Sequence, residues 1–186
     1  MDKPAMRIIG LGGLRGSGKD TCAEILREEF GFRSIAYADP MKRYVCEMVG
    51  IPLEDYDEFK RSKLTWNREV SPFPQEISGR DICLQVGMLY RELRPDYFME
   101  QVWTFIREAI VDGAPGVVVT DVRFPDELEQ MKCLSAQTIK ITRDSEEVSG
   151  HESERLAQQN LGWDHVIQNN GTLQALQLEL REIIET

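Results

Sequence analysis

The sequence contains no apolar run near the roughly 20 residues that are needed to cross a bilayer, and no secretory signal pattern precedes its first apolar stretch. Cysteine is scarce as well. The four cysteines are widely separated and have no paired spacing: Cys22, Cys46, Cys83 and Cys133. Such cysteines are typical of reduced core residues and argue against a disulfide framework or a cysteine metal site. We therefore predict a cytoplasmic protein that does not bind membranes.

Positive charge is also in short supply, with 22 lysines and arginines against 32 acidic residues and a formal net charge of -10. Binding of polymeric DNA or RNA depends on neutralising many phosphates, so this balance argues against such a partner. A small phosphorylated ligand needs only a few well-placed cations, so the negative net charge does not argue against such a ligand. The two histidines, His151 and His165, show no metal-ligand spacing.

The most informative segment joins a short apolar run to a helix-like pattern through a cluster of glycines. It reads Gly13-Leu14-Arg15-Gly16-Ser17-Gly18-Lys19-Asp20-Thr21. Glycines allow positive φ and a close approach of the backbone to a ligand, and a helix N-terminus attracts anions. Lys19 adds a full positive charge for the terminal phosphates, and Arg15 is placed to contact them too. The order strand, glycine-rich turn, lysine and helix predicts an ATP-binding phosphate loop of the Walker A kind over residues 13–21.

One position departs from the usual phosphate-loop pattern, because Asp20 stands where serine or threonine normally follows the lysine. The hydroxyl that approaches magnesium is then that of Thr21, or the metal is held mainly through water and acidic groups. Asp121 closes a fully apolar strand and is the candidate acidic group. A strand-terminal aspartate also serves as a simple helix cap, so both interpretations remain for Asp121.

Strand and helix patterns alternate along the chain, which predicts one α/β domain over residues 1–186 with a central parallel sheet flanked by helices, a three-layer sandwich. The expected strands lie near 8–12, 33–38, 116–121, 136–142 and 165–168. The expected helices lie at 22–30, 39–48, 79–93, 96–110, 125–131, near 153–159 and at 173–183. Residues 50–78 are predicted to form an irregular or partly helical insertion that faces the substrate. The polar segment 143–152 is predicted to form a lid.

Ligands of open parallel sheets gather at the carboxyl ends of the strands, where several charged residues are expected. Arg123 is placed to reach a phosphate or to form a salt bridge within its turn. Asp39 caps the following helix or orients an acceptor group, with Lys42 one turn further on facing the same cleft. Arg143 begins the predicted lid and would bring a cation to the transferred phosphoryl group.

The insertion contains one candidate for base recognition. Trp66, with Lys63 and Arg68 close by, is placed to stack on a base or to cover a small core. We predict substrate binding for Trp66 and Arg68.

The ordered motifs resemble those of the phage-type deoxynucleoside monophosphate kinases, within the P-loop nucleoside monophosphate kinase superfamily. The residues that match are Gly16-Ser17-Gly18-Lys19-Asp20-Thr21, Tyr37-Ala38-Asp39-Pro40-Met41-Lys42, Leu84-Gln85-Val86-Gly87, Asp121-Val122-Arg123-Phe124-Pro125-Asp126-Glu127, His151-Glu152-Ser153-Glu154 and Asn169-Asn170-Gly171-Thr172-Leu173. The resemblance covers nearly the whole chain and explains Asp20 as part of a Gly-Lys-Asp-Thr ending. Residues 50–78 match no strong pattern, which leaves base selection open.

The resemblance implies Mg²⁺-dependent transfer of the γ-phosphoryl group from ATP to a deoxynucleoside 5′-monophosphate. Lys19 and Arg15 would hold the donor phosphates, and Asp39, Lys42 and Arg123 would face the acceptor. Arg143 would belong to the lid. The resemblance also implies host cytoplasm as the location if the protein is encoded by a phage. It leaves a homodimer open, with helix 79–93 as a candidate interface.

Two other functions remain compatible with these residues. One is a P-loop kinase that acts on another phosphorylated small molecule, such as phosphomevalonate or dephospho-coenzyme A. The other is a nucleotide-dependent binding or switch protein, for which the acidic residues Glu54–Glu58 would offer an interaction surface.

Overall fold

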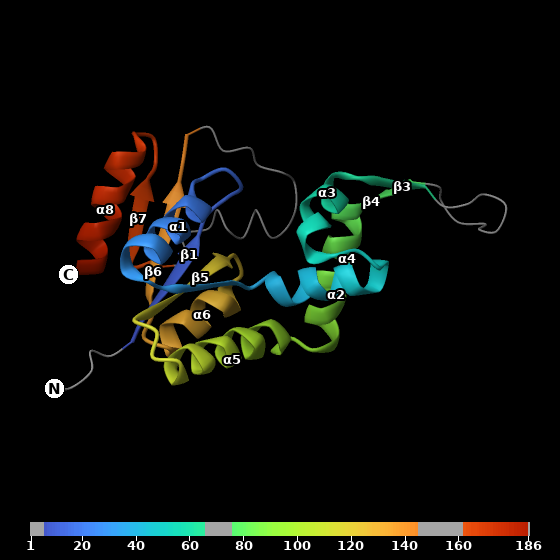
Figure 1. The fold of residues 1–186 in the computed structure, drawn as a ribbon, viewed down its shortest axis with the longest axis horizontal. Helices are drawn as coiled ribbons and strands as arrows, with labels where there is room; N and C mark the ends of the chain where they lie inside the picture. The colour runs from blue at the N-terminus through green and yellow to red at the C-terminus, as the bar shows by residue number, and fades with distance from the viewer. Residues whose placement is uncertain (1–5, 66–75, 145–161, 186) are drawn as a thin grey trace. The chain divides into compact units, whose positions relative to one another are not determined.

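Five parallel strands form the main sheet in the order β2-β5-β1-β6-β7 (Figure 1). Their bounds are β1 Arg7–Gly12, β2 Arg33–Ala36, β5 Gly116–Val122, β6 Gln137–Thr142 and β7 His165–Gln168. The central pair β1 and β5 is apolar and largely buried, as expected for parallel strands that are covered on both faces. Because all five strands run in one direction, their carboxyl ends meet at one edge of the sheet.

The computed structural model describes residues 6–65, 76–144 and 162–185. The chain divides into two compact units. The sheet unit comprises the chain up to Tyr37 and from Val102 onwards, and the helical unit comprises Ala38–Gln101. None of the helices in the described ranges is both long and apolar enough to span a membrane.

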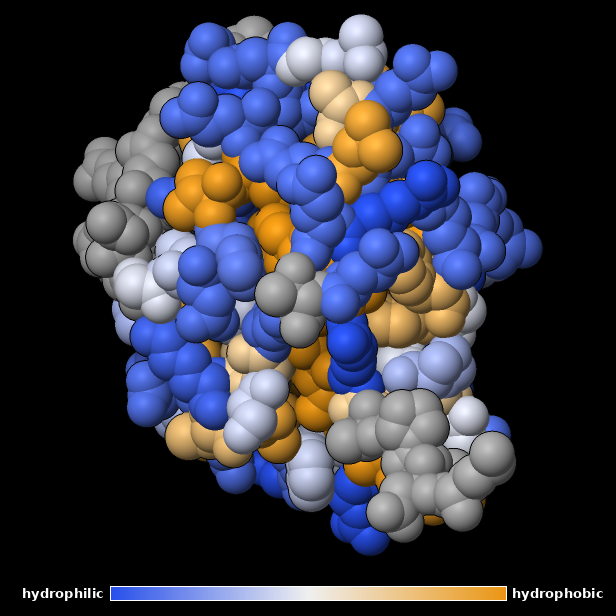
Figure 2. All heavy atoms as spheres, turned by 90° about the vertical axis from the view of Figure 1, so that its left-hand side faces the viewer, coloured by the Kyte–Doolittle hydropathy of each residue, from blue (hydrophilic) through white to orange (hydrophobic). Residues whose placement is uncertain are grey.

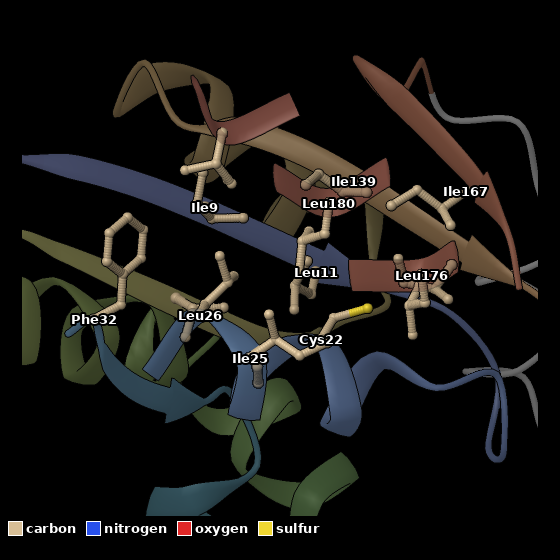
Figure 3. Close-up of a cluster of buried hydrophobic side chains, with 14 residues drawn as sticks. Ile9, Leu11, Cys22, Ile25, Leu26, Phe32, Ile139, Ile167, Leu176 and Leu180 are labelled. Atoms are coloured by element: carbon tan, nitrogen blue, oxygen red, sulfur yellow. The ribbon is translucent and has the colours of Figure 1, made fainter. Parts of the chain in front are cut away.

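Helices cover both faces of the main sheet. α1 (Lys19–Phe30) and α8 (Leu173–Glu185) pack on one face, and α6 (Pro125–Cys133) packs on the other, where Met131 lies against Gly10. Figure 3 shows side chains from β1, α1, β6, β7 and α8 pointing toward one another in the first of these layers. This cluster is a hydrophobic core of the sheet unit. Hydrophilic residues cover most of the face shown in Figure 2, with hydrophobic residues in separate groups between them.

The helical unit consists of short elements around a smaller core. Its helices are α2 (Asp39–Val49), the 3-10 turn η1 (Leu53–Asp55), α3 (Tyr56–Arg61) and α4 (Gly79–Leu93), and α5 (Tyr97–Val111) begins in it. The strands β3 (Lys63–Thr65) and β4 (Glu76–Ser78) pair antiparallel. Buried Val45, Cys46, Tyr56, Phe59 and Cys83 form the core of this unit.

Local chemistry explains where α4 begins. The Ser78 hydroxyl accepts a hydrogen bond from the Asp81 backbone N–H at 3.1 Å, and the Asp81 carboxylate accepts one from the Ser78 N–H at 3.2 Å. This capping box satisfies two N–H groups that the first turn of a helix leaves without a partner. Gly79 follows because a side chain there would collide with the Phe59 carbonyl, which lies 2.0 Å from its ideal Cβ position.

The observed architecture confirms the predicted α/β class and its central parallel sheet. Most predicted elements agree with the observed ones to within a few residues, although β2 ends at Ala36 rather than at residue 38. The antiparallel β3–β4 pair is an addition, because a single sheet was expected. The predicted insertion at 50–78 is partly helical, as η1 and α3 show. Of the predicted lid, only residues 143 and 144 lie within the described part of the chain, and the helix expected near 153–159 lies outside it.

Candidate phosphate-binding site

The glycine-rich loop lies between the end of β1 and the start of α1, as the sequence predicts. Gly13, Gly16 and Gly18 have φ angles of 147°, 83° and 103°, a range that side chains disfavour. A Cβ on Gly13 would also lie 2.4 Å from the Ile141 carbonyl oxygen. The loop therefore requires glycine at these positions for its backbone shape. That shape brings successive N–H groups to the positive end of α1, where anions bind.

Lys19 is the first residue of α1, and its side chain lies inside the site rather than in solvent. The residue is 6% exposed, and its ammonium lies 3.5 Å from Asp121 Oδ1 and 3.7 Å from Asp20 Oδ2. The Asp20 side chain is itself 85% exposed, whereas that of Asp121 is 15% exposed. Asp121 is therefore the partner that holds the Lys19 ammonium in a largely desolvated position.

A β-bulge in β5 places the Asp121 carboxylate beside the loop. Gly10 pairs with Val119 and Gly12 pairs with Val122, so β5 has one residue more than β1 between these pairs. Asp121 lies in this stretch with a φ of 61°, a left-handed conformation that aspartate tolerates better than most residues. Bulges of this kind redirect a side chain out of the regular alternation of a strand. The bulge explains how a strand residue contacts the lysine of the loop.

Arg123 lies two residues beyond Asp121 and contacts the same carboxylate. Its Nη2 donates to Asp121 Oδ1 at 3.0 Å. The turn that holds it is fixed by Glu127, which is 2% exposed and accepts hydrogen bonds from the backbone N–H groups of Arg123 at 2.7 Å and Phe124 at 3.1 Å. One carboxylate thus gathers two cations, Lys19 and Arg123, and a second buried carboxylate fixes the turn from which Arg123 extends.

Arg143 and Asn169 connect the far strands to the loop. Arg143 Nε donates to the Asn169 carbonyl oxygen at 2.9 Å, and the Asn169 side-chain Nδ2 donates to the Ser17 carbonyl oxygen at 2.8 Å. Arg143 itself is exposed, whereas Asn169 is 6% exposed. Arg143 is therefore linked to the phosphate loop through one buried residue.

The surroundings of the loop are closely packed. The Trp163 ring lies so near Gly12 that an added Cβ would be 2.2 Å from it. Ser17 is fully buried, and its hydroxyl has no hydrogen-bond partner among the described residues. Cys22, one turn into α1, is also fully buried, and burial raises the pKa of its thiol to about 12, with smaller contributions from Asp20 and Glu179. This cysteine is a core residue and not a nucleophile.

The side chains near the loop fit a cation that is held mainly by a ligand. Within the described ranges, no group of three or more histidine, cysteine, aspartate and glutamate residues could hold a metal alone. Asp121 offers one carboxylate beside Lys19, and Thr21 is exposed in the first turn of α1. Mg²⁺ commonly keeps several waters and binds through one or two carboxylates together with substrate phosphates. The donor set is compatible with that mode.

The predicted residues Asp39 and Lys42 lie in the helical unit and contact each other. Lys42 Nζ lies 2.8 Å from Asp39 Oδ1, and both residues line a cavity of about 310 Å³. The other lining residues are Arg43, Leu53, Glu54, Tyr56 and Asp57. Burial and a hydrogen bond with Cys83 raise the pKa of the Tyr56 phenol, so that it is neutral at physiological pH. The cavity therefore combines cations, carboxylates and one neutral aromatic side chain.

The structure brings some of the predicted site residues together and leaves others apart. Lys19, Asp121 and Arg123 form one contact group, and Arg143 joins it through Asn169. Arg15 and Thr21 are exposed, and no contact of either with this group is observed. Trp66 and Arg68 lie outside the described residues.

Three residues near the loop were missed as site residues by reasoning from the sequence. Asn169 belongs to a recognised motif but had no assigned role, and Glu127 was only the end of another motif. Trp163 gave no signal at all. The roles of Asn169 and Trp163 depend on contacts with the distant loop, which no local pattern reveals. Glu127 could have been found, because it is the N3 residue of α6 and accepts from the backbone just before the helix, as acidic residues at this position commonly do.

Comparison with known proteins shows what the whole chain is similar to. A protein of Acanthamoeba polyphaga mimivirus, named "Putative deoxynucleotide monophosphate kinase", is 28% identical to this chain, and the match covers 91% of each protein. No family profile matches the chain.

Two solved structures share the fold over nearly the full length of the chain. The dephospho-CoA kinase from Campylobacter jejuni matches with a TM-score of 0.52 and 13% identity, and covers 97% of this chain and 96% of its own. TT1252 from Thermus thermophilus matches with a TM-score of 0.54 and 19% identity, and covers 97% of each chain. These two likenesses show that the chain shares its fold with both proteins.

Proposed function

We propose that this protein transfers the γ-phosphoryl group of ATP to a deoxynucleoside 5′-monophosphate and forms the diphosphate and ADP. The observation that supports a phosphoryl transferase most directly is the group of Lys19, Asp121 and Arg123 beside the glycine-rich loop. The name of the mimivirus relative supports the choice of acceptor. The acceptor is the part of the proposal that depends on this relative.

The reaction needs little covalent help from the protein. An oxygen of the acceptor phosphate attacks the γ-phosphorus, the bond to the β–γ bridging oxygen breaks, and that oxygen leaves with the electron pair as part of ADP. The acceptor phosphate is already an anion, so no general base is required. The protein must align two polyanions and offset their repulsion, which is a task for fixed cations.

The site can perform this task with the cations described above. In the proposal, Lys19 contacts the terminal phosphates of ATP, and Asp121 holds the ammonium in place until ATP binds. Arg123 is held in the same way and is available to the transferred group or to the acceptor. Arg15 and Arg143, both exposed near the loop, would add positive charge once the substrates are bound.

A magnesium ion fits this proposal as the partner of ATP. Asp121 and Thr21 would help to hold it together with the nucleotide phosphates and water, and it would supply neutralisation of phosphate charge. Asp121 then has two roles, because it holds Lys19 and is also the carboxylate available to the cation. Residues 16–18 and Asp20 would contribute to binding of the donor through the backbone of the loop.

The cavity of the helical unit is the candidate contact for the acceptor. Lys42 and Arg43 are cations suited to a phosphate monoester, and Asp39 fixes the Lys42 ammonium at 2.8 Å. Tyr56 is buried in the core of this unit and contributes only to the wall of the cavity. Substrate contacts from Trp66 and Arg68 remain a prediction.

An ADP-release assay with ATP and magnesium tests the proposal. The acceptors dGMP, dTMP, dCMP and dAMP are offered one at a time, beside the four ribonucleotides, dephospho-coenzyme A and phosphomevalonate. We expect turnover with at least one deoxynucleotide and only background ADP release without an acceptor. Turnover with another phosphorylated compound alone would retain the kinase and overturn its acceptor. If none of the acceptors raises ADP release above the level with ATP alone, the proposal of a kinase is refuted and a nucleotide-dependent switch is favoured.

A further inference from the structure

Asn169 joins three parts of the sheet unit through hydrogen bonds from a nearly buried position. It follows β7, and its backbone N–H donates to the Thr142 carbonyl oxygen at 2.8 Å. Its own carbonyl oxygen accepts from Arg143 Nε at 2.9 Å, and its side-chain Nδ2 donates to the Ser17 carbonyl oxygen at 2.8 Å. Only the last of these bonds depends on the identity of the side chain. That bond ends on the phosphate loop.

The bond to Ser17 controls the direction of a neighbouring N–H group. In a trans peptide, the carbonyl and the N–H of the next residue point in opposite directions. A Ser17 carbonyl that is held toward Asn169 therefore turns the Gly18 N–H away from Asn169. Gly18 begins α1 as its N-cap, so this N–H belongs to the group of donors that anions contact at a helix N-terminus.

Gly18 permits the approach of Asn169. Its φ is 103°, and a Cβ on it would lie 2.2 Å from Asn169 Nδ2. The absence of a side chain at Gly18 therefore makes room for the Asn169 amide, so the two residues are sterically matched. The Asn169 amide occupies the space that a side chain at residue 18 would fill.

We infer that Asn169 is a positioning residue of the phosphate loop, whose side-chain amide fixes the Ser17–Gly18 peptide in the orientation that binds the triphosphate of ATP. The inference rests on the proposed function in one respect, because it takes ATP as the ligand of the loop. Without the bond from Asn169, the loop loses this restraint and must be ordered when ATP binds, which lowers affinity. The contact between Arg143 and the Asn169 carbonyl is a backbone contact and survives substitution of the side chain.

A pair of neighbouring substitutions tests the inference. Asn169→Asp keeps the size of the side chain but replaces the N–H donor with an acceptor that faces the Ser17 carbonyl. Asn170→Asp is the matched control, because it makes the same charge change one residue away. Asn170 is exposed, and its Oδ1 accepts from the Asp144 N–H at 3.0 Å, a role that a carboxylate retains. Asn169→Ala serves as a second variant if Asn169→Asp does not fold.

Titration calorimetry with Mg-ATP and steady-state kinetics give the readouts. One net hydrogen bond corresponds to about a tenfold change in affinity, so we expect ATP to bind about tenfold more weakly to Asn169→Ala and weaker still to Asn169→Asp. The KM for ATP should rise by the same factor while the KM for the acceptor stays unchanged. Asn170→Asp should match the wild type within about twofold.

The outcomes separate this inference from the proposed function. If the wild type binds ATP and transfers phosphate but both Asn169 variants keep its ATP affinity, the positioning role is refuted and the function stands. If the Asn169 variants have a lower melting temperature in the absence of ATP but keep the wild-type KM for ATP, the residue has only a structural role and the inference fails. If the wild type itself does not bind ATP, both the proposed function and this inference are overturned.

Discussion

Replacing Lys19 with alanine is the sharpest test of the site, because the structure separates its effect on catalysis from its effect on folding. The lysine ammonium lies 3.5 Å from Asp121 Oδ1 in a position that is 6% exposed. Removal of one partner of a buried pair costs about 3–5 kcal/mol when the other charge is left alone. Asp121 is not left alone, because Arg123 Nη2 remains 3.0 Å from the same oxygen. We therefore expect a loss of only about 1–2 kcal/mol in the free energy of unfolding.

The effect on catalysis should be much larger. Loss of one preorganised electrostatic contact to the transition state lowers turnover by about 100- to 1,000-fold, which is about 2.7–4 kcal/mol. The ADP-release assay measures this loss, and urea denaturation of the same preparation measures stability. Arg27→Ala is the control on the same helix, since Arg27 pairs with Glu24 at 2.5 Å on the exposed face of α1 and should matter little to either quantity.

Lys19→Met provides a second variant that retains most of the aliphatic stem without the charge. Turnover within threefold of wild type in either folded variant would refute the assignment of Lys19 as a phosphate contact. A large loss of stability in both would show instead that Arg123 does not compensate Asp121, and the assumption behind the estimate would be wrong.

Three further predictions concern the surroundings of the site and the core. Glu127→Ala removes a buried carboxylate that accepts hydrogen bonds from two backbone N–H groups, so it should lower turnover and reduce the free energy of unfolding in urea by about 2–4 kcal/mol. The control Glu129→Ala, on the exposed side of α6, should change neither quantity, and equal effects of the two variants would contradict the role of Glu127. Leu180→Ala leaves a cavity in the core between α8 and the sheet and should cost about 2–5 kcal/mol, and a loss below 1 kcal/mol would show that the core relaxes around it. Because burial raises the pKa of Cys22 to about 12, this thiol should resist iodoacetamide at pH 8 in the folded protein, while the exposed Cys133 reacts. Mass spectrometry of the labelled protein distinguishes the two cysteines, and rapid labelling of Cys22 would disprove its burial.

Much of the sheet unit could be predicted because its signals are local. The apolar run of β5, the glycines of the loop and the periodic apolar positions of α8 each lie within one element, and the observed bounds agree closely. The placement of Lys19 near Asp121 also agrees with the sequence, since parallel strands end at one edge. The β3–β4 pair was not predicted, because strands of three residues each have too few positions to show an alternation.

The remaining parts of the site depend on contacts that no local pattern contains. Asn169 donates to Ser17 across 152 positions of sequence, and an asparagine before another asparagine and a glycine is typical of an ordinary turn. The bulge in β5 is equally hidden, since nothing in the strand sequence, three valines followed by Thr120, Asp121 and Val122, marks an extra residue. Only the pairing of β5 with β1 shows that one extra residue is present.

The bulge has a consequence for how this protein can evolve. Residue 121 must meet two requirements at once, because its backbone is left-handed and its side chain must be an anion of the right length. Asparagine tolerates the left-handed backbone but has no charge, whereas glutamate has the charge but is one methylene longer and tolerates this backbone conformation less well. Each single step away from aspartate therefore loses either conformation or charge. Sequence drift at this position should be far narrower than at the exposed cations around it.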